Sequence, residues 1–265
     1  MRRTAAWLAG AAVLVLTAAC SSGDATDSEP TDDASGAGGG GDQTLTVFGA
    51  ASLTEPMDEL LEMFAEEHPD VTIQPAVYDG SSTLVTQLTE GAQADVLATA
   101  NTSTMDDLVA AFPDQGYEPA LFATNTLVIA VPEGNPQGIT GLDDLLEATF
   151  VVCAPEVPCG AAATELFEIA GFEGEPLSLE QNVTAAAERV VSGDVDAALV
   201  YATDVVSRDD ELEAVVPDEA GDVINEYPIV ALDGSALGQE FTDLVLSEDG
   251  MHVLAGYGFG VPEAQ

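Results

Sequence analysis

Positive charge is almost absent from this chain. It has no lysine and only four arginines against 48 aspartates and glutamates, for a formal net charge of −44. Proteins attract nucleic acid and anionic lipid mainly through Lys and Arg. The composition therefore argues against both as direct partners. We interpret the acidic surface as an adaptation to strong salt, in which dissolved ions screen the self-repulsion.

Cysteine and histidine are also scarce, with three and two residues respectively. Beyond Cys20, the only cysteines are Cys153 and Cys159, six positions apart in a segment that contains two prolines. In an exported protein, such a pair predicts a disulfide. A metal site needs more ligands, and His68 and His252 have no nearby partners in the sequence. We therefore expect no metal cation site.

The N-terminal segment indicates export. Arg2 and Arg3 precede an apolar run at residues 5–16, which is too short to span a bilayer stably, and small residues then lead to Cys20. This order resembles a bacterial lipoprotein signal, with Thr17 an imperfect match. The resemblance implies that residues 1–19 are a signal peptide and that Cys20 is lipidated. An ordinary signal peptide is the alternative. Residues 20–42 are rich in Ser, Asp, Thr and Gly and predict a flexible tether.

The rest of the chain predicts an α/β domain. Its 265 residues are 46% hydrophobic, enough for a large core. Apolar spacing predicts strands that alternate with helices, which is typical of a mainly parallel sheet covered on both faces. The expected strands are residues 44–48, 71–77, 94–99, 127–131, 150–153, 197–201 and 229–232, and the expected helices are 57–64, 84–88, 102–110, 141–148, 160–170, 183–191 and 241–255.

Groups that donate hydrogen bonds gather where several predicted strands end. Ser52, Ser81, the loop 158–160 and residues 182–183 each lie between a strand and a helix, and Tyr201 ends a strand. Ligands bind at the carboxyl ends of strands in open α/β sheets, and helix N-termini favour anions. None of these groups is cationic. Each also has a simpler interpretation: the serines can merely cap helices, and a buried tyrosine can merely fill the core.

Eight short motifs run in order from about residue 45 to 259. They are Val47-Phe48-x-Ala50-Ala51-Ser52-Leu53-Thr54, Ser81-Ser82-Thr83-Leu84-x-x-Gln87-Leu88-x-x-Gly91-Ala92-x-Ala94-Asp95-Val96, Asn125-x-Leu127-Val128, Val157-Pro158-x-Gly160, Asn182-Val183, Val200-Tyr201-x-Thr203-Asp204, Tyr227-Pro228-Ile229 and Tyr257-Gly258-Phe259. Taken together, these motifs resemble a known family, the molybdate-binding proteins of bacterial ABC importers.

The resemblance implies a two-lobed, type 2 periplasmic-binding-protein-like fold with mainly parallel sheets and a two-strand hinge. Carried over by position, lobe 1 comprises residues 43–124 plus 230–265, and lobe 2 comprises residues 125–229. The ligand would lie between the lobes. The protein would be a monomer, exported and lipid-anchored to the outer face of the cytoplasmic membrane.

The resemblance also implies a ligand and its contacts. Molybdate or tungstate would be held by the hydroxyls of Ser52, Ser81 and Tyr201 and by the backbone N–H groups of Cys159 and Val183. The family commonly has alanine where this chain has Cys159, but a backbone contact tolerates that change. The protein would have no cofactor and no enzymatic activity, and its partner would be the membrane permease of an ABC importer.

Two alternatives remain open at this stage. The same fold could bind another oxyanion such as sulfate. A secreted serine hydrolase with Ser52 or Ser81 as nucleophile would need a histidine base and an orienting acid. Neither His68 nor His252 stands in a strand-end motif, and the Gly-x-Ser-x-Gly elbow is missing.

Overall fold

The structure is a computed structural model that describes residues 43–262. The predicted signal peptide (1–19), the lipidation site Cys20 and the tether (20–42) lie outside these residues. Eleven strands form in the described part. They are β1 (Gln43–Leu45), β2 (Val47–Ala50), β3 (Val71–Ile73), β4 (Val77–Asp79), β5 (Val96–Ala98), β6 (Ala120–Pro132), β7 (Phe150–Cys153), β8 (Leu179–Glu180), β9 (Ala197–Tyr201), β10 (Leu212–Val215) and β11 (Ile224–Ala231).

Nearly all of these strands follow one path of neighbours, in the order β4-β2-β5-β11-β6-β9-β7-β8, with β10 also paired to β6. Strands β2, β4 and β5 are parallel to one another, as are β7, β8 and β9. The long strands β6 and β11 run antiparallel between these two groups. The result is two parallel sets joined by two crossing strands.

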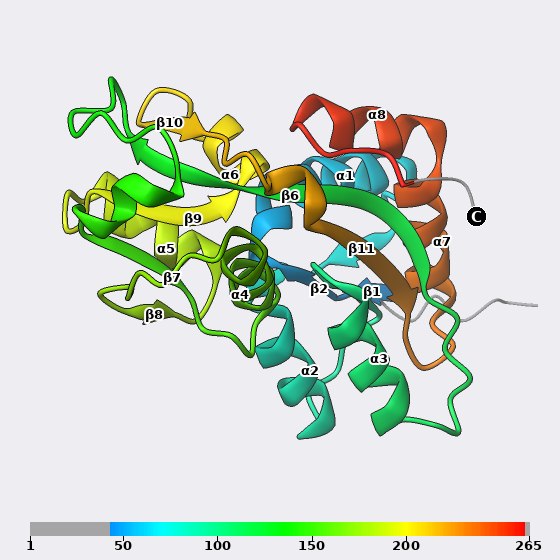
Figure 1. Ribbon diagram of the computed structural model, residues 1–265. Coiled ribbons are helices and arrows are strands. Elements are labelled where there is room, and N and C mark those ends of the chain that lie inside the picture. Colours follow the sequence, from blue (N-terminus) through cyan, green and yellow to red (C-terminus); the bar gives the residue numbers. More distant parts are fainter. Residues whose placement is uncertain (1–42, 263–265) are drawn as a thin grey trace, which may run out of the picture. The chain divides into compact units, whose positions relative to one another are not determined.

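Strand β6 changes partners along its length. Residues 120–126 pair with β11, whereas residues 127–130 pair with β9. Figure 1 shows β6 passing from the side of α7 and α8 towards β9 and β10. The change of partner falls close to the lobe boundary expected at residues 124 and 125. The division into two lobes at these positions stays a prediction.

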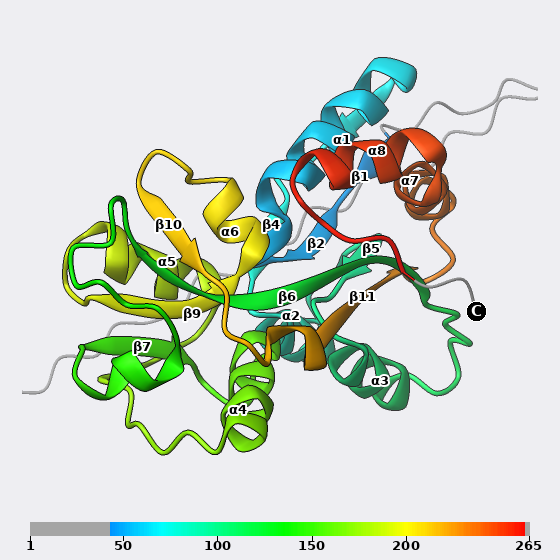
Figure 2. The ribbon, with the colours of Figure 1, turned by 45° about the horizontal axis from the view of Figure 1, so that its top comes forward.

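Helices cover both faces of the sheet beside β2. Figures 1 and 2 show α1, α7 and α8 together on one side of β2 and β5, and α2 and α3 on the other. Apolar side chains of α2 and α3 pack with those of β2, β5 and β11. The helices are α1 (Thr54–Glu67), α2 (Ser81–Thr89), α3 (Thr102–Ala111), α4 (Pro158–Ala170), α5 (Val183–Val191), α6 (Ala202–Val206), α7 (Ala236–Leu246) and α8 (Glu248–Gly256), with 3₁₀ turns η1 (Ala51–Leu53), η2 (Leu142–Leu146) and η3 (Ala220–Asp222).

Several expected elements differ in detail from the structure. The expected strands at 44–48 and 71–77 are each split: β1 pairs with β3 in a small separate sheet, while β2 and β4 belong to the main one. The expected helix 241–255 is two helices, because Ser247 has extended dihedrals and caps α8. Residues 141–148 form only the 3₁₀ turn η2. Strand β10 was not expected from the sequence. Within residues 43–262, no helix has the length and apolar character needed to cross a membrane.

Candidate functional site

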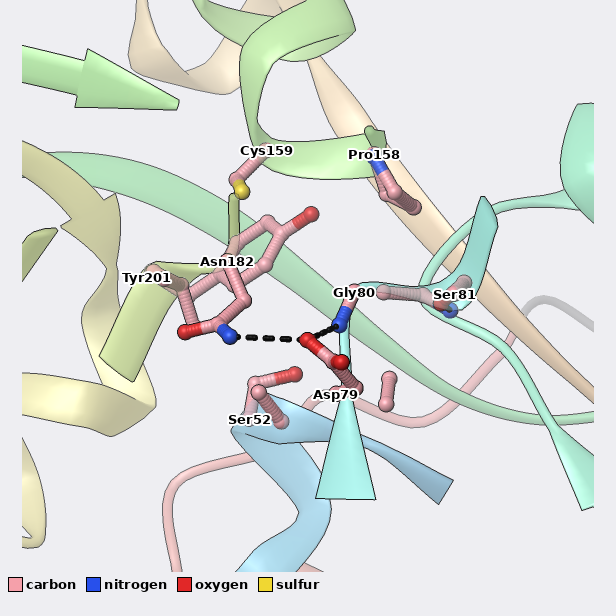
Figure 3. A pocket seen from close by; sticks show the side chains of 12 residues that line it. Ser52, Asp79, Gly80, Ser81, Pro158, Cys159, Asn182 and Tyr201 are labelled. Carbon is pink, nitrogen blue, oxygen red and sulfur yellow. Dashed lines mark hydrogen bonds between the residues drawn. The ribbon is translucent and has the colours of Figure 1, made fainter. Parts of the chain in front are cut away.

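A small pocket lies where the carboxyl ends of both parallel strand sets meet. The empty space between its walls is about 210 Å³, a value that includes the opening to solvent. All five predicted ligand residues line this one pocket. Its lining residues are Ala50, Ala51, Ser52, Asp79, Gly80, Ser81, Ala100, Pro158, Cys159, Asn182, Val183 and Tyr201. Figure 3 shows eight of them around the space.

Three hydroxyl groups reach the pocket from different strand ends. Ser52 follows β2 in the turn η1, Ser81 begins α2 after β4, and Tyr201 is the last residue of β9. All three side chains are buried, with at most 6% of their surface exposed. Burial raises the pKa of the Tyr201 phenol well above its usual value, so the phenol keeps its proton and can donate it.

Two helix N-termini bring backbone N–H groups to the same pocket. Cys159 lies in the first turn of α4, and Val183 is the first residue of α5. N–H groups in a first turn have no partner within their own helix. Pro158 suits the start of α4 because it has no N–H to satisfy, and the Asn182 side chain caps α5 by accepting from Ala185 N. Both helices therefore point their positive ends at the pocket.

The hydroxyl of Ser52 does not cap the following helix. Neither η1 nor α1 receives a capping hydrogen bond from a side chain, and Thr54 Oγ1 instead donates to Ala51 O at 2.8 Å. The oxygen of Ser52 lies 3.0 Å from Tyr227 Oη. The simpler interpretation of Ser52 as a cap is wrong. Ser52 and Glu55 have the sequence spacing of a capping box, but no such box forms in the structure.

One acidic side chain also lines the pocket, and the sequence did not predict it. Asp79 Oδ1 accepts from Gly80 N at 2.7 Å and from Asn182 Nδ2 at 2.9 Å (Figure 3). The lining therefore contains a carboxylate acceptor in addition to the five predicted donors. The position of Asp79 at the end of β4, next to Gly80 and Ser81, was the available signal. Its partner Asn182 is 103 residues away, and sequence spacing does not reveal it.

The two walls of the pocket touch each other through these residues. Besides the bond from Asn182 to Asp79, Ser82 Oγ donates to Glu156 O at 2.5 Å. Both contacts join the turn between β4 and α2 to segments that precede α4 and α5. The pocket is thus enclosed between two walls that are linked directly at its rim.

The pocket contains no basic side chain. Arg189 and Arg208 are the only Lys or Arg residues between positions 43 and 262, and neither lines it. Arg189 Nη1 lies 3.6 Å from Asp194, and Arg208 Nη1 lies 3.5 Å from Glu188. An anion in this pocket would be held by hydroxyls, amides and helix termini, not by a counter-charge.

A buried carboxyl group lies directly behind Tyr201. Asp204 Oδ2 accepts from Tyr201 N at 2.9 Å, and burial raises the pKa of this carboxyl from 3.8 to about 7. A raised carboxyl pKa favours folding while the group is protonated. Its stabilising effect is complete below the ordinary pKa and is lost as the pH rises through about 7. Near neutral pH, this group therefore carries only part of a negative charge.

The geometry does not supply the base that a serine hydrolase needs. His68 caps the C-terminal end of α1, stacks on Phe64 at 4.0 Å and lies 3.8 Å from Glu240. Ser52 precedes the other end of this 14-residue helix, which spans about 20 Å. His252 is in α8, and neither histidine lines the pocket. The serines in the pocket therefore lack a neighbouring histidine.

The Cys153 and Cys159 side chains are joined as a disulfide, with Cα atoms 5.7 Å apart. Cys153 ends β7 and Cys159 lies in the first turn of α4, so the bond closes the loop that presents the Cys159 N–H.

We expect two cysteine-to-alanine substitutions, at Cys153 and Cys159, to lower stability without removing the pocket's amide donor. In the chain-entropy model, closing a loop of about seven residues contributes about 2–2.5 kcal/mol. Thermal unfolding with and without reductant measures the loss, and reductant should change only the unsubstituted protein. Intact mass after thiol alkylation gives the redox state. Two alkylated thiols in protein isolated without reductant would contradict the expectation.

Comparison with known proteins places the chain in a family. The model of the bacterial extracellular solute-binding proteins matches residues 45–260. The molybdate-binding protein ModA of Mycobacterium tuberculosis (strain H37Rv) is 38% identical over 227 residues, covering 84% of this chain and 86% of the relative.

Solved structures share the fold at lower identity. The periplasmic molybdate-binding protein of Azotobacter vinelandii has a TM-score of 0.69 at 16% identity, covering 83% of this chain and 100% of that one. The sulfate-binding protein SubI of M. tuberculosis has a TM-score of 0.70 at 16% identity, covering 83% and 88%. The expected periplasmic-binding-protein-like α/β fold is confirmed. The chain belongs to the family of bacterial extracellular solute-binding proteins.

Proposed function

We propose that the protein binds molybdate or tungstate outside the cytoplasm and delivers it to the membrane permease of an ABC importer. The observation that carries this proposal is the pocket itself, in which three hydroxyls and two helix N-termini converge without any cation. Each hydrogen bond to a charged group contributes roughly 1.5–3 kcal/mol, so five such bonds suffice for tight binding after desolvation. The relationship to ModA, a protein named for molybdate binding, supports the choice of ligand.

We assign the ligand contacts to Ser52, Ser81 and Tyr201 through their hydroxyls and to Cys159 and Val183 through their N–H groups. Lining of one small pocket supports this assignment. Placement at strand ends and helix N-termini agrees with it, since these are the usual positions for anions in α/β folds. A lipid anchor at Cys20 and a monomeric state complete the proposal and rest on the sequence alone.

Fold likeness does not choose between oxyanions, because one of the similar structures is a sulfate-binding protein. Sulfate carries the same charge as molybdate but is smaller. In a cavity fitted to the larger anion, it would stretch or lose several hydrogen bonds. Affinity, not fold, therefore has to separate the two candidates.

Asp79 favours a second candidate, hydrogen phosphate. Phosphate at neutral pH carries an O–H that needs an acceptor, and a carboxylate provides one. Asp79 Oδ1 already accepts from Gly80 N and Asn182 Nδ2, which leaves only its other oxygen. We retain molybdate as the first choice because every other polar group assigned to the ligand is a donor. A buried O–H without an acceptor costs about 1–3 kcal/mol, or roughly a tenfold loss of affinity or more.

The test is calorimetric titration with molybdate, tungstate, sulfate and phosphate. Calorimetry suits the protein because its only tryptophan, Trp7, lies in the predicted signal peptide. We expect tight binding of the first two anions, weak binding of sulfate and scarcely any of phosphate. Ser52→Ala and Ser81→Ala should each weaken molybdate by roughly tenfold or more, because each removes one charge-assisted hydrogen bond.

Controls identify which part of the proposal fails. Ser192→Ala is the matched serine variant, since Ser192 follows α5 at an exposed position outside the pocket, and it should bind as the wild type does. Sulfate or phosphate matching molybdate would refute the ligand assignment. Phosphate binding that disappears in Asp79→Asn would establish the second candidate. Unchanged molybdate affinity in both serine variants of the pocket would refute the site.

A further inference from the structure

A set of buried polar side chains lies behind the pocket and contacts its hydroxyls from the side away from the ligand. It consists of Asn125, Asn225 and Tyr227, at most 6% exposed, and the backbone of Ala100. Asn125 and Asn225 are directly opposite each other in the register of β6 and β11. The two crossing strands therefore carry polar groups to the back of the pocket.

The amide of Asn225 fixes the direction of the Tyr201 hydrogen bond. Asn225 Nδ2 donates to Ala100 O at 2.8 Å, and a carbonyl oxygen can only accept, so this atom must be the nitrogen. The same Nδ2 lies 3.0 Å from Tyr201 Oη and donates its second proton there. The Tyr201 oxygen is thus an acceptor on its rear side. Its own proton can then be donated towards the pocket.

The amide of Asn125 acts on Ser52 in the same way, through Tyr227. Asn125 Oδ1 accepts from Thr126 N at 3.0 Å, which fixes the orientation of the amide because a backbone N–H can only donate. Asn125 Nδ2 then donates to Thr203 Oγ1 at 2.8 Å and faces Tyr227 Oη at 3.4 Å. Tyr227 Oη lies 3.0 Å from Ser52 Oγ, and either hydroxyl can donate in this pair. When Tyr227 donates, the Ser52 proton is left to point into the pocket.

The third hydroxyl needs no side chain behind it. Ser81 Oγ accepts from Ala100 N at 3.1 Å, and this backbone N–H is an obligatory donor. The backbone of Ala100 therefore contacts two parts of this network. Its N–H donates to Ser81 Oγ, and its carbonyl oxygen accepts from Asn225 Nδ2. All three hydroxyls of the pocket therefore have a hydrogen-bond partner within the protein.

We propose that Asn125, Asn225 and Tyr227 are positioning residues that hold the hydroxyls of Ser52 and Tyr201 as donors towards the ligand, so that the site selects anions that carry no proton. The proposal rests on the assigned anion site. A hydroxyl has one proton and two lone pairs, so a group that donates from behind uses one lone pair and leaves the hydroxyl proton to face the ligand. Among the pocket-lining side chains, Asp79 is then the main group left to accept.

A double-mutant cycle on the full protein tests the direction of this chain of hydrogen bonds. Tyr227→Phe keeps the ring and removes the hydroxyl that contacts Ser52 and Asn125. It should weaken molybdate by about tenfold in the wild-type background, since one buried hydrogen bond is lost. In the Ser52→Ala background the effect should fall to about twofold or less, because coupled residues are non-additive. In the Ser81→Ala background, Tyr227→Phe should still weaken molybdate binding by about tenfold.

Two further measurements separate positioning from a general structural effect. Tyr117→Phe is the matched control, because its hydroxyl donates to exposed Asp233 and not to the pocket, and it should leave the molybdate affinity unchanged. Molybdate titrations in excess phosphate should show more competition in Tyr227→Phe than in the wild type, since Ser52 is then free to accept a phosphate proton. If Tyr227→Phe does not fold, the same cycle uses Asn225→Ala, whose effect should vanish in Tyr201→Phe and persist in Ser52→Ala.

The outcomes distinguish this inference from the proposed function. Failure of the wild type to bind molybdate would overturn the function. Molybdate binding with equal effects of Tyr227→Phe in the Ser52→Ala and Ser81→Ala backgrounds would overturn only the inference. Equal phosphate competition in the wild type and Tyr227→Phe would also overturn it.

Discussion

Replacing Gly80 by alanine should weaken molybdate binding by roughly a hundredfold or more while leaving the chain folded, because it would cost about two charge-assisted hydrogen bonds. A Cβ atom at this position would lie 2.5 Å from Gln181 O and 3.2 Å from Val157 Cγ1. Both neighbours stand immediately before the helices that present Val183 and Cys159. The added methyl would therefore push the two amide donors away from the serines on the opposite wall.

The backbone of Gly80 itself accepts alanine, with a φ of −56° and a ψ of 130°. Gly80→Ala should therefore disturb the contact between the two walls of the pocket and leave the backbone conformation of residue 80 unchanged. The matched control is Gly141→Ala, since a Cβ there meets nothing within 4 Å. Calorimetry gives the affinity, and thermal unfolding shows whether each variant is folded. Binding by folded Gly80→Ala within threefold of the control would show that the walls do not need this close approach.

Local patterns predicted the elements that build the pocket. Ser52, Ser81 and Cys159 follow predicted strands. Tyr201 ends a predicted strand, and Val183 begins a predicted helix. Apolar runs that are ended by small or capping residues mark these boundaries from sequence alone. Asn182, a residue type common at N-caps, directly precedes the predicted helix 183–191, and its side chain does cap α5 by accepting from Ala185 N. In a parallel α/β fold, strand ends gather at one edge, and this brought the five residues together.

Register and long-range contacts could not be predicted in the same way. The pairing of Asn225 with Asn125 depends on how β11 aligns with β6, and the sequence of either strand does not state it. Asn125 and Tyr227 stand in segments that resemble the family, but the contacts that give them a role come from the fold. The contact between Asp79 and Asn182 likewise crosses from one wall to the other.

The full length of strand β6 could not be predicted from the sequence either. The expected strand 127–131 is only the second half of β6, because the first half contains polar residues such as Thr124 and Asn125 that interrupt its apolar pattern. Residue Asn125 is nevertheless buried, and its amide is fully used in hydrogen bonds. A polar residue satisfied by a distant partner looks like a loop residue when only the sequence is considered.

The thermal midpoint should rise strongly with salt near neutral pH. If residues 1–19 are removed, 48 acidic residues remain against Arg189 and Arg208, for a net charge of −46. Those two arginines form the only Lys or Arg ion pairs in the described residues, so most carboxylates there face like charges. The Debye length falls from about 30 Å at 0.01 M to about 3 Å at 1 M salt. Recovering about 3 kcal/mol of repulsion would raise the midpoint by roughly 6–12 °C for a domain of this size.

Thermal unfolding in a NaCl series at neutral pH measures this rise, and the same series at lower pH is its control. The sequence isoelectric point is about 4.1, and near pH 4 about half of the carboxylates are protonated, given ordinary pKa values of about 4. Screening then has less repulsion to remove, and the salt dependence should become much smaller. Salt also strengthens apolar burial, and that effect would persist at both pH values. A midpoint that stays flat at neutral pH, or rises equally at both, would show that the acidic surface does not limit stability at low salt.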